Sequence, residues 1–441
     1  MKKNILNTLI TLTAIFAVSA CSSTESSGVQ LLRGPEGLDH SYSYDQTRQT
    51  SYLSFKDKMR SFSSKVSVSF AKAHSERGDN VTMSPLSLEL CLGMAVPSSD
   101  GVTREELLNA FDIDYTSFDN YYKLFFDDLS FEIENSPKEV ASQLLLTNSV
   151  WVDNEVPLLD KGLDKLVNNY YAYVYECDFN GANRRTNRAM NRFVREKTND
   201  LLSPQFDLPT TTMFVFLNTV YLKDIWNDAG DDLAYAKEEY KFVDYEGNIS
   251  EKRLLEGKYN KGKIINGDDY SSFFTRTEHG LNLYFIKPND DSGKSALDVF
   301  TEENINYVLN SDNYVYQDDE KHERYFTNCV FPEYEASSHF DVKDLLINDF
   351  GVESIFNTTC DFSNLSNNQV WCDEMQQFAK LRVDKKGIEG AAVTYMAYAG
   401  AAGPDGYEEI YETFVVDKEF GFVLTNSSND IIFSGVVTTI D

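Results

Sequence analysis

Histidine and cysteine are scarce in this 441-residue sequence, and they do not occur at the spacings that metal sites need. The five histidines lie far apart and outside any HExxH pattern, and the six cysteines form no CxxC pair. The G-x-S-x-G pattern of a serine hydrolase is absent as well. We therefore expect no metal, no cofactor and no catalytic residues, and we do not expect an enzyme.

Basic residues are also few. Lysine and arginine number 40 against 70 aspartates and glutamates, which gives a formal net charge of −30. A charge of this sign repels nucleic acid and anionic membrane surfaces, so we expect neither as a direct partner. No basic stripe that would bind a polyanion stands out in the sequence.

Long apolar runs are missing beyond the N-terminus, where one such run forms a leader. Lys2 and Lys3 precede an apolar stretch from Ile5 to Val18, and Ser19-Ala20 stands directly before Cys21. This order is typical of a signal peptide, and the last four residues resemble a bacterial lipobox, whose cysteine sulfur carries diacylglycerol. The alternative is a plain secretory signal followed by an incidental cysteine.

From this leader we expect three parts of the chain. Residues 1–20 are a lipoprotein signal peptide, residues 21–54 are a flexible tether rich in Ser, Gly, Gln and Tyr, and residues 55–441 are a single domain. The protein is then lipid-anchored at the bacterial cell envelope, at the outer membrane or the cell surface. Contact with the membrane is expected only through the lipid on Cys21.

The remaining cysteines are odd in number, so they cannot all pair within one chain. They are Cys91, Cys177, Cys329, Cys360 and Cys372. We interpret them as buried thiols, with a Cys360–Cys372 disulfide left open as an alternative.

Within the domain, helical signals come early and strand signals late, which favours an α+β fold. Met59, Phe62, Val66 and Phe70 recur at helical spacing. Ser84-Pro85 reads as an N-cap followed by proline at the first helical position, and Thr103 with Glu106 reads as a capping box. Near-continuous apolar runs predict buried strands, and the last two flank a polar turn: Leu144–Val152, Met213–Leu222, Phe420–Leu424 and Ile431–Val437.

Several segments in colinear order resemble the serpin family of protease inhibitors, and the match runs from about residue 55 to 441. They are Asn80–Ser87, Asn187–Thr198, Phe216–Lys223 followed by Trp226, Phe331–Tyr334, Phe350-Gly351, Phe356 and Asp361–Ser363. The resemblance implies the serpin fold, with about nine helices, three β-sheets and an exposed reactive-centre loop. It also implies that the central sheet opens, and it assigns the residues that control the opening: Ser84, Ser87, Asn218, Trp226, Glu333, Gln377 and Lys385. The alternative is that Ser84 and Ser87 only cap a helix and that Trp226 is an ordinary core residue.

A stretch of the sequence directly after Lys386 is nearly free of charged residues. From Gly387 to Pro404 only Glu389 is charged, where a chain that is 25% charged would hold about four or five such residues. A buried helix would also exclude charge, but the glycines weaken that reading. The stretch resembles the serpin hinge, whose residues here are Gly387, Ile388, Glu389, Gly390, Ala391, Ala392, Val393 and Thr394.

The resemblance implies a mechanism that accounts for this composition. After a protease cuts the loop and is held as an acyl-enzyme, the loop enters the central sheet as a new strand, so alternate residues have to fit a core. Ile388 and Thr394 belong to the inward set, with Gly390, Ala392, Met396 and Tyr398, and Glu389 belongs to the outward set.

The usual family distance from Gly387 places the cut near Ala401-Ala402, with Tyr398, Ala399 and Gly400 as alternatives. A small residue at the cut suits elastase-like or broad-specificity serine proteases, and papain-like proteases stay open. We expect a monomer that is consumed as it inhibits. The rival interpretation is a serpin that does not inhibit and acts as a surface-binding or carrier protein.

Three departures from the family pattern bear on the mechanism. Ile388 stands where Thr or Ser is usual, and Gln377 stands where many animal relatives have a buried histidine, so a pH switch at that position is not expected. Lys385 and Glu333 carry the opposite charges from the usual pair. We interpret these two as an ion pair whose polarity is reversed.

Overall fold

The structure, a computed structural model, describes residues 28–37, 44–47, 49–74, 78–136, 139–226, 233–372, 375–389 and 407–440. Helices occupy most of the first half of this described chain, as predicted. The α-helices are α1 (Tyr44–Thr47), α2 (Thr50–His74), α3 (Pro85–Ser98), α4 (Gly101–Phe111), α5 (Tyr115–Leu129), α6 (Asp160–Tyr170), α7 (Asn183–Lys197), α8 (Ala296–Val299), α9 (Glu302–Leu309) and α10 (Lys343–Phe350), and the 3-10 helices are η1 (Ser311–Asn313) and η2 (Ser354–Phe356). Within the described ranges, none of these helices has the length and apolar composition to cross a bilayer.

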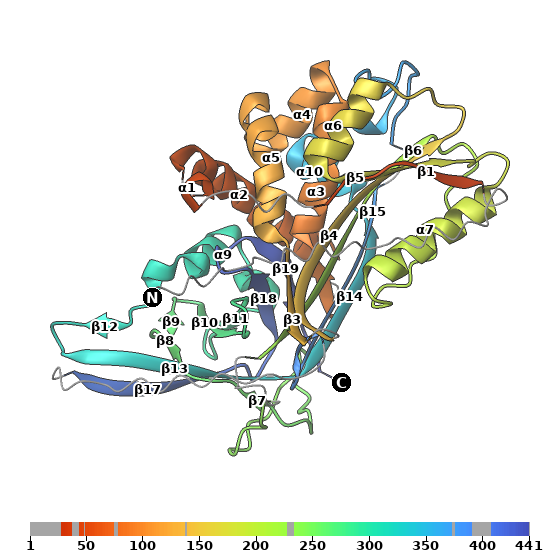
Figure 1. Cartoon of the computed structure of the whole chain (residues 1–441). Coiled ribbons are helices and arrows are strands. Elements are labelled where there is room, and N and C mark those ends of the chain that lie inside the picture. Colours follow the sequence, from red (N-terminus) through yellow and green to blue (C-terminus); the bar gives the residue numbers. More distant parts are fainter. Residues whose placement is uncertain are drawn as a thin grey trace, which may run out of the picture.

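The central sheet has eight strands in the order β1-β5-β4-β6-β16-β15-β14, with β3 paired to β4 (Figure 1). Its strands are β1 (Val29–Arg33), β3 (Phe131–Ser136), β4 (Glu139–Asp153), β5 (Ala172–Cys177), β6 (Phe214–Ile225), β14 (Tyr334–Asp341), β15 (Gln376–Asp384) and β16 (Gly387–Ile388). β4 and β5 are parallel, and the other described pairs in this sheet are antiparallel.

Two further sheets complete the α+β architecture. The second sheet has the order β2-β19-β18-β11-β10-β9, and the third sheet is built on β12-β13-β17, with β7 and β8 also paired to β13. The bounds in the second are β2 (Val81–Met83), β9 (Ile265–Asn266), β10 (Tyr270–Arg276), β11 (Asn282–Pro288), β18 (Phe420–Thr425) and β19 (Ile431–Val437). Those in the third are β7 (Leu255–Glu256), β8 (Asn260–Lys261), β12 (Gln317–Asp318), β13 (Glu323–Phe331) and β17 (Glu408–Val415). The predicted C-terminal hairpin is the antiparallel pair β18–β19.

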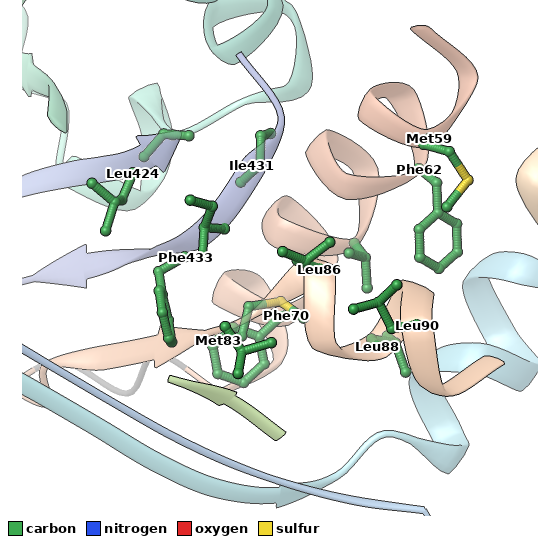
Figure 2. Packing of buried hydrophobic residues seen from close by; sticks show 14 of the residues in the cluster. Met59, Phe62, Phe70, Met83, Leu86, Leu88, Leu90, Leu424, Ile431 and Phe433 are labelled. Carbon is green, nitrogen blue, oxygen red and sulfur yellow. The ribbon is translucent and has the colours of Figure 1, made fainter. Parts of the chain in front are cut away.

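The main core lies where α2 and α3 pack against the second sheet. In Figure 2, Phe433 of β19 lies near Phe70 of α2, Met59 and Phe62 lie farther along the same helix, and Leu86 of α3 lies between these two groups; all five side chains are buried. The helical spacing seen in the sequence therefore marks the buried face of α2.

A second, smaller core lies on the other face of the central sheet, under α7. Val150 and Val152 of β4 belong to the main core, whereas Trp151 between them packs with Phe193 of α7. Successive side chains of a strand point to opposite faces, so α7 covers the face of the central sheet that α3 does not cover (Figure 1).

The start of α3 was predicted correctly, but the start of α4 was not. Ser84 caps α3, since its Oγ accepts a hydrogen bond from the Ser87 amide at 3.1 Å. The predicted capping box of Thr103 and Glu106 is wrong, because α4 begins at Gly101 and is capped by Asp100. Both side chains instead bind η2. The Glu106 carboxylate accepts three hydrogen bonds from the segment around Ser354, and the Thr103 hydroxyl is hydrogen-bonded to Ser354. Tertiary contacts therefore override the local capping pattern.

The segment expected to be a tether contains regular structure. Residues 29–33 form β1, an edge strand antiparallel to β5, and α2 begins at Thr50. Arg33 forms ion pairs with Asp160 and Asp164 of α6. This part of residues 21–54 is therefore attached to the domain.

Candidate functional site between strands β6 and β15

A two-residue strand, β16, lies between β6 and β15 and pairs with both. Gly387 and Ile388 are opposite Ile225 and Asp224 on one side, and opposite Asp384 and Val383 on the other. Ile388 is fully buried. A Cβ atom on Gly387 would lie 2.1 Å from the Asp224 carbonyl oxygen, so no side chain fits at this position.

Beyond β16, β6 and β15 are separated by a cavity of about 120 Å³. Residues 213–220 line it on the β6 side and residues 375–380 on the β15 side, with Leu88 and Cys91 of α3 also in the wall. In the described sheet, β15 pairs with β14 and β16 and not with β6. The site is thus a gap in the central sheet, and the two residues of β16 form the first paired positions of an additional strand at one end of it.

Trp226 and Glu333 form hydrogen bonds at the end of the gap where β16 lies. Both are among the residues that the resemblance assigned to the opening of the sheet. The Trp226 indole Nε1 donates to the Asp384 carbonyl oxygen at 2.6 Å. Glu333 accepts a hydrogen bond from the backbone amide of Lys385 at 3.0 Å and another from the Tyr235 hydroxyl at 2.9 Å. Glu333 and Lys385 are neighbours, as the ion-pair hypothesis requires, and the bond between them runs through the Lys385 backbone.

On the β15 side, the Gln377 side chain bonds to the start of α3. The Ser84 amide donates to Gln377 Oε1 at 3.0 Å, and Gln377 Nε2 donates to the Ser84 carbonyl at 2.9 Å. The Ser84 hydroxyl in turn donates to the Ile432 carbonyl of β19 at 2.8 Å. These bonds join β15, α3 and the second sheet at one residue.

On the β6 side, Asn218 belongs to a chain of amide hydrogen bonds. Its Nδ2 donates to Asn148 Oδ1 at 2.9 Å, and Asn148 Nδ2 donates to the Tyr170 carbonyl at 2.8 Å and to the Tyr122 hydroxyl at 3.1 Å. Asn218 Oδ1 is buried beside the gap and has no hydrogen-bond partner within the described residues. A buried acceptor in this state favours any conformation that supplies a donor.

A histidine that the sequence analysis did not single out lies next to β16. His279, in the turn between β10 and β11, lies with its Nδ1 2.8 Å from Asp224 Oδ1. Asp224 is fully buried, pairs with Ile388 in the sheet and also accepts from the Ser142 hydroxyl. The hydrogen bond to Asp224 raises the pKa of His279 above its usual value, although burial opposes the shift. The two residues are 55 positions apart in the sequence, so no local sequence pattern predicts the pair.

Glu389 marks the point where the chain turns away from β16. Its φ is +41°, in the left-handed region that non-glycine residues rarely adopt. The side chain is half-buried, its Oε2 has no hydrogen-bond partner within the described residues, and burial raises the pKa of the carboxyl. The outward position expected for Glu389 is thus only partly open to solvent.

The other predicted site residues lie outside the described residues. These are Gly390, Ala391, Ala392, Val393 and Thr394 of the hinge, Ala401 and Ala402 at the expected cut, and Cys21 at the expected lipid attachment. Among the residues that are described, no cluster of three or more His, Cys, Asp or Glu side chains is arranged to bind a metal ion. Cys360 is a free thiol, so the alternative Cys360–Cys372 disulfide is not formed.

Comparisons with known proteins agree with this geometry. The family model described as "Serpin (serine protease inhibitor)" matches residues 58–440. Iripin-1 of Ixodes ricinus is 26% identical over 380 residues, covering 82% of this chain and 89% of that protein. Human neuroserpin is 24% identical over 386 residues, covering 81% and 86%.

Solved structures match over nearly their whole length. Serpin48 of the insect Tenebrio molitor has a TM-score of 0.69 at 19% identity, covering 91% of this chain and 100% of that one. Tengpin, a thermophilic serpin in the native state, has a TM-score of 0.68 at 19% identity, covering 93% and 100%. The predicted fold is confirmed, and the chain belongs to the serpin family.

Proposed function

We propose that this chain inhibits serine proteases and is consumed in doing so. The target's serine hydroxyl attacks the carbonyl carbon of Ala401, the bond to the Ala402 nitrogen breaks, and the new amine leaves with the proton. Ala401 stays joined to the protease as an ester. The freed loop then enters the gap between β6 and β15 and carries the protease with it.

The observation that carries this proposal is β16. Gly387 and Ile388 already pair with both walls of the gap, and the cavity continues between β6 and β15 beyond them. The next residues toward the expected cut are nearly free of charge, as entry into a core requires. The loop therefore begins at the end of the gap, and its uncharged residues suit the apolar interior that they would enter.

Insertion supplies enough free energy to disable a protease. About a dozen residues gaining roughly 0.5–1.5 kcal/mol per hydrogen bond release on the order of 10 kcal/mol before side-chain burial is added. A protease domain is typically stable by about 5–15 kcal/mol. The intact inhibitor is then metastable and is held by a kinetic barrier.

The class of target and the location belong to the same proposal. Alanine at the cut favours elastase-like or broad-specificity serine proteases, with papain-like enzymes as an alternative. We further propose that lipid on Cys21 holds the inhibitor at the bacterial cell envelope, where it meets proteases outside the cell.

The test is a mixing experiment with four proteases: elastase, subtilisin, trypsin and papain. The purified chain from residue 22 is incubated with each, and the products are separated in denaturing gels. A complex that survives denaturant, with elastase or subtilisin most of all, is the expected result. Cleavage near residue 401 without such a complex would contradict inhibition and favour the rival carrier or binding function.

A further inference from the structure

Helix α7 is strongly basic in a strongly acidic protein. Six of its residues are arginine or lysine and one is glutamate, whereas the whole chain carries a net charge of −30. Arg184, Arg188 and Arg192 recur every four residues, so they lie on one side of the helix, and all three are exposed. We call these three residues the arginine stripe. The stripe is not evident in the sequence, because the acidic average of the whole chain conceals it until the helix is placed.

Within the described residues, the arginine stripe does not attach α7 to the rest of the fold; its hydrogen bond from Arg188 Nε to the Arg184 carbonyl, at 3.0 Å, stays within the helix. Met190, Phe193 and Val194 attach α7 to the central sheet from its buried side. In the described part of the chain, no ion pair involves a residue of the stripe, whereas Arg195 is paired with Asp200. Like charges four residues apart destabilise a helix, so the stripe is a cost to the isolated molecule.

The path of the chain places the stripe close to the expected lipid. The Asp178 amide donates to the Gly28 carbonyl at 3.0 Å, and a Cβ atom on Gly28 would lie 2.9 Å from the Cβ of Ala182, directly before α7. The seven residue-to-residue steps from Cys21 to Gly28 span at most about 25 Å when fully extended. A lipid on Cys21 therefore holds the N-terminal end of α7 within about 25 Å of the membrane.

We propose that Arg184, Arg188 and Arg192 form a docking surface for the phosphate groups of anionic lipids. Guanidinium groups bind phosphate oxygens through paired hydrogen bonds. Acidic residues elsewhere on the protein are screened beyond about 8–10 Å at physiological salt, so the local charge decides the contact. The two acyl chains of a diacylglycerol on Cys21 are by themselves a stable anchor, so the arginine stripe acts on how the domain lies against the membrane and not on whether it is attached.

This contact orients the inhibitor on its membrane. β12, β13 and β17 lie at the opposite side of the molecule from α7 in Figure 1. When α7 faces the lipid, the third sheet, where the reactive loop ends at β17, faces away from the membrane. The orientation rests on the lipid attachment proposed above, but binding of α7 to an anionic surface does not.

The test uses the chain from residue 22, without lipid, and vesicle sedimentation. Vesicles of phosphatidylcholine are compared with vesicles that also contain phosphatidylglycerol. We expect binding only to the anionic vesicles, reversal by high salt, and about hundredfold weaker binding by the variant R184Q/R188Q/R192Q, because each basic residue contributes a factor of about five. The control K237Q/K241Q/K252Q removes three exposed lysines elsewhere and is expected to bind as the unmodified chain does.

Equal vesicle binding by the arginine variant and the unmodified chain would overturn the proposal, and so would absence of binding by the unmodified chain. Binding of heparin but not of vesicles through the stripe would also overturn it, in favour of a soluble polyanion. Thermal unfolding checks that both variants fold. Both are expected to form the protease complex normally, so failure of inhibition is distinguished from failure of docking. Mass spectrometry of Cys21 tests the lipid independently.

Discussion

Gln377 of β15 and Ser84 at the start of α3 exchange two hydrogen bonds, each donating once and accepting once. Because the Ser84 hydroxyl also binds β19, the β15 wall of the gap is tied to the second sheet. On the β6 wall, the side-chain carbonyl oxygen of Asn218 lines the cavity and has no hydrogen-bond partner among the residues that the structure describes. The two walls therefore differ in their side-chain hydrogen bonds: Gln377 on β15 is paired with Ser84, whereas Asn218 on β6 has an acceptor left to satisfy.

Replacing Gln377 by alanine should destabilise the native protein. The Ser84 amide and carbonyl lose their buried partners, and unsatisfied groups of this kind cost about 1–3 kcal/mol each. We expect the free energy of unfolding in urea to fall by about 2 kcal/mol or more. Gln376→Ala, on the exposed side of the same strand, serves as the control and should change it by less than about 0.5 kcal/mol. Equal effects of the two substitutions would show that the Ser84 bonds do not stabilise the sheet.

Gly387→Ala tests whether β16 is part of the folded state. The added Cβ atom has no space against the Asp224 carbonyl, so β16 is expelled or the sheet is strained. Overpacking of this type costs about 1–3 kcal/mol, and we expect the melting temperature to fall accordingly. Lys386→Ala, next to it but exposed, should leave the melting temperature unchanged. A Gly387→Ala variant as stable as the unmodified chain would place Gly387 outside the sheet in solution.

Charge at alternate loop positions should separate inhibition from cleavage. Arginine at Thr394, in the inward set, has to be buried during insertion, at a cost of several kcal/mol. We expect Thr394→Arg to be cut as a substrate and to form less than about a tenth of the covalent complex, whereas Val393→Arg, in the outward set, keeps most of it. The ratio of complex to cleaved product in denaturing gels measures the difference. If both variants trap the protease equally, the loop does not enter as a strand.

Cutting the loop should stabilise the protein. Insertion that releases on the order of 10 kcal/mol corresponds to a rise in melting temperature of roughly 10 °C for a chain of this size. Calorimetry of the chain before and after limited proteolysis near residue 401 measures the rise. Identical melting of nicked and intact protein would mean that no strain is stored.

The His279–Asp224 pair should make stability depend on pH. Because the pKa of His279 is raised in the folded state, its contribution is complete below the ordinary histidine pKa and is lost as the pH rises through the folded value. We expect the free energy of unfolding to fall more between about pH 6 and pH 9 in the unmodified chain than in His279→Gln. Asp224 and Glu278 are the acidic groups that act on the imidazole, and both are present in the variant. The same pH slope in both proteins would rule out this linkage.

Local signals in the sequence found the elements but not the contacts that join them. Ser84-Pro85 marks the start of α3, and the apolar runs mark β6 and the β18–β19 hairpin, since these patterns follow from backbone geometry. The partners of Gln377 and His279 lie 293 and 55 residues away, at Ser84 and Asp224, so only the folded chain reveals them. The sequence did not predict β1, because its residues have little strand character of their own. Its stability comes from pairing with β5.

In the insertion proposed above, the pairing of Ile388 with Val383 also fixes, before any cut is made, which loop residues will face the core. A slip by one residue would reverse every later side chain, and the pairs at Gly387 and Ile388 prevent it. The position of the cut then alters only how long the inserted strand becomes. A protease that cuts after Tyr398 and one that cuts after Ala401 would leave the same inward side chains over their common length, so one loop can serve as bait for enzymes of different preference.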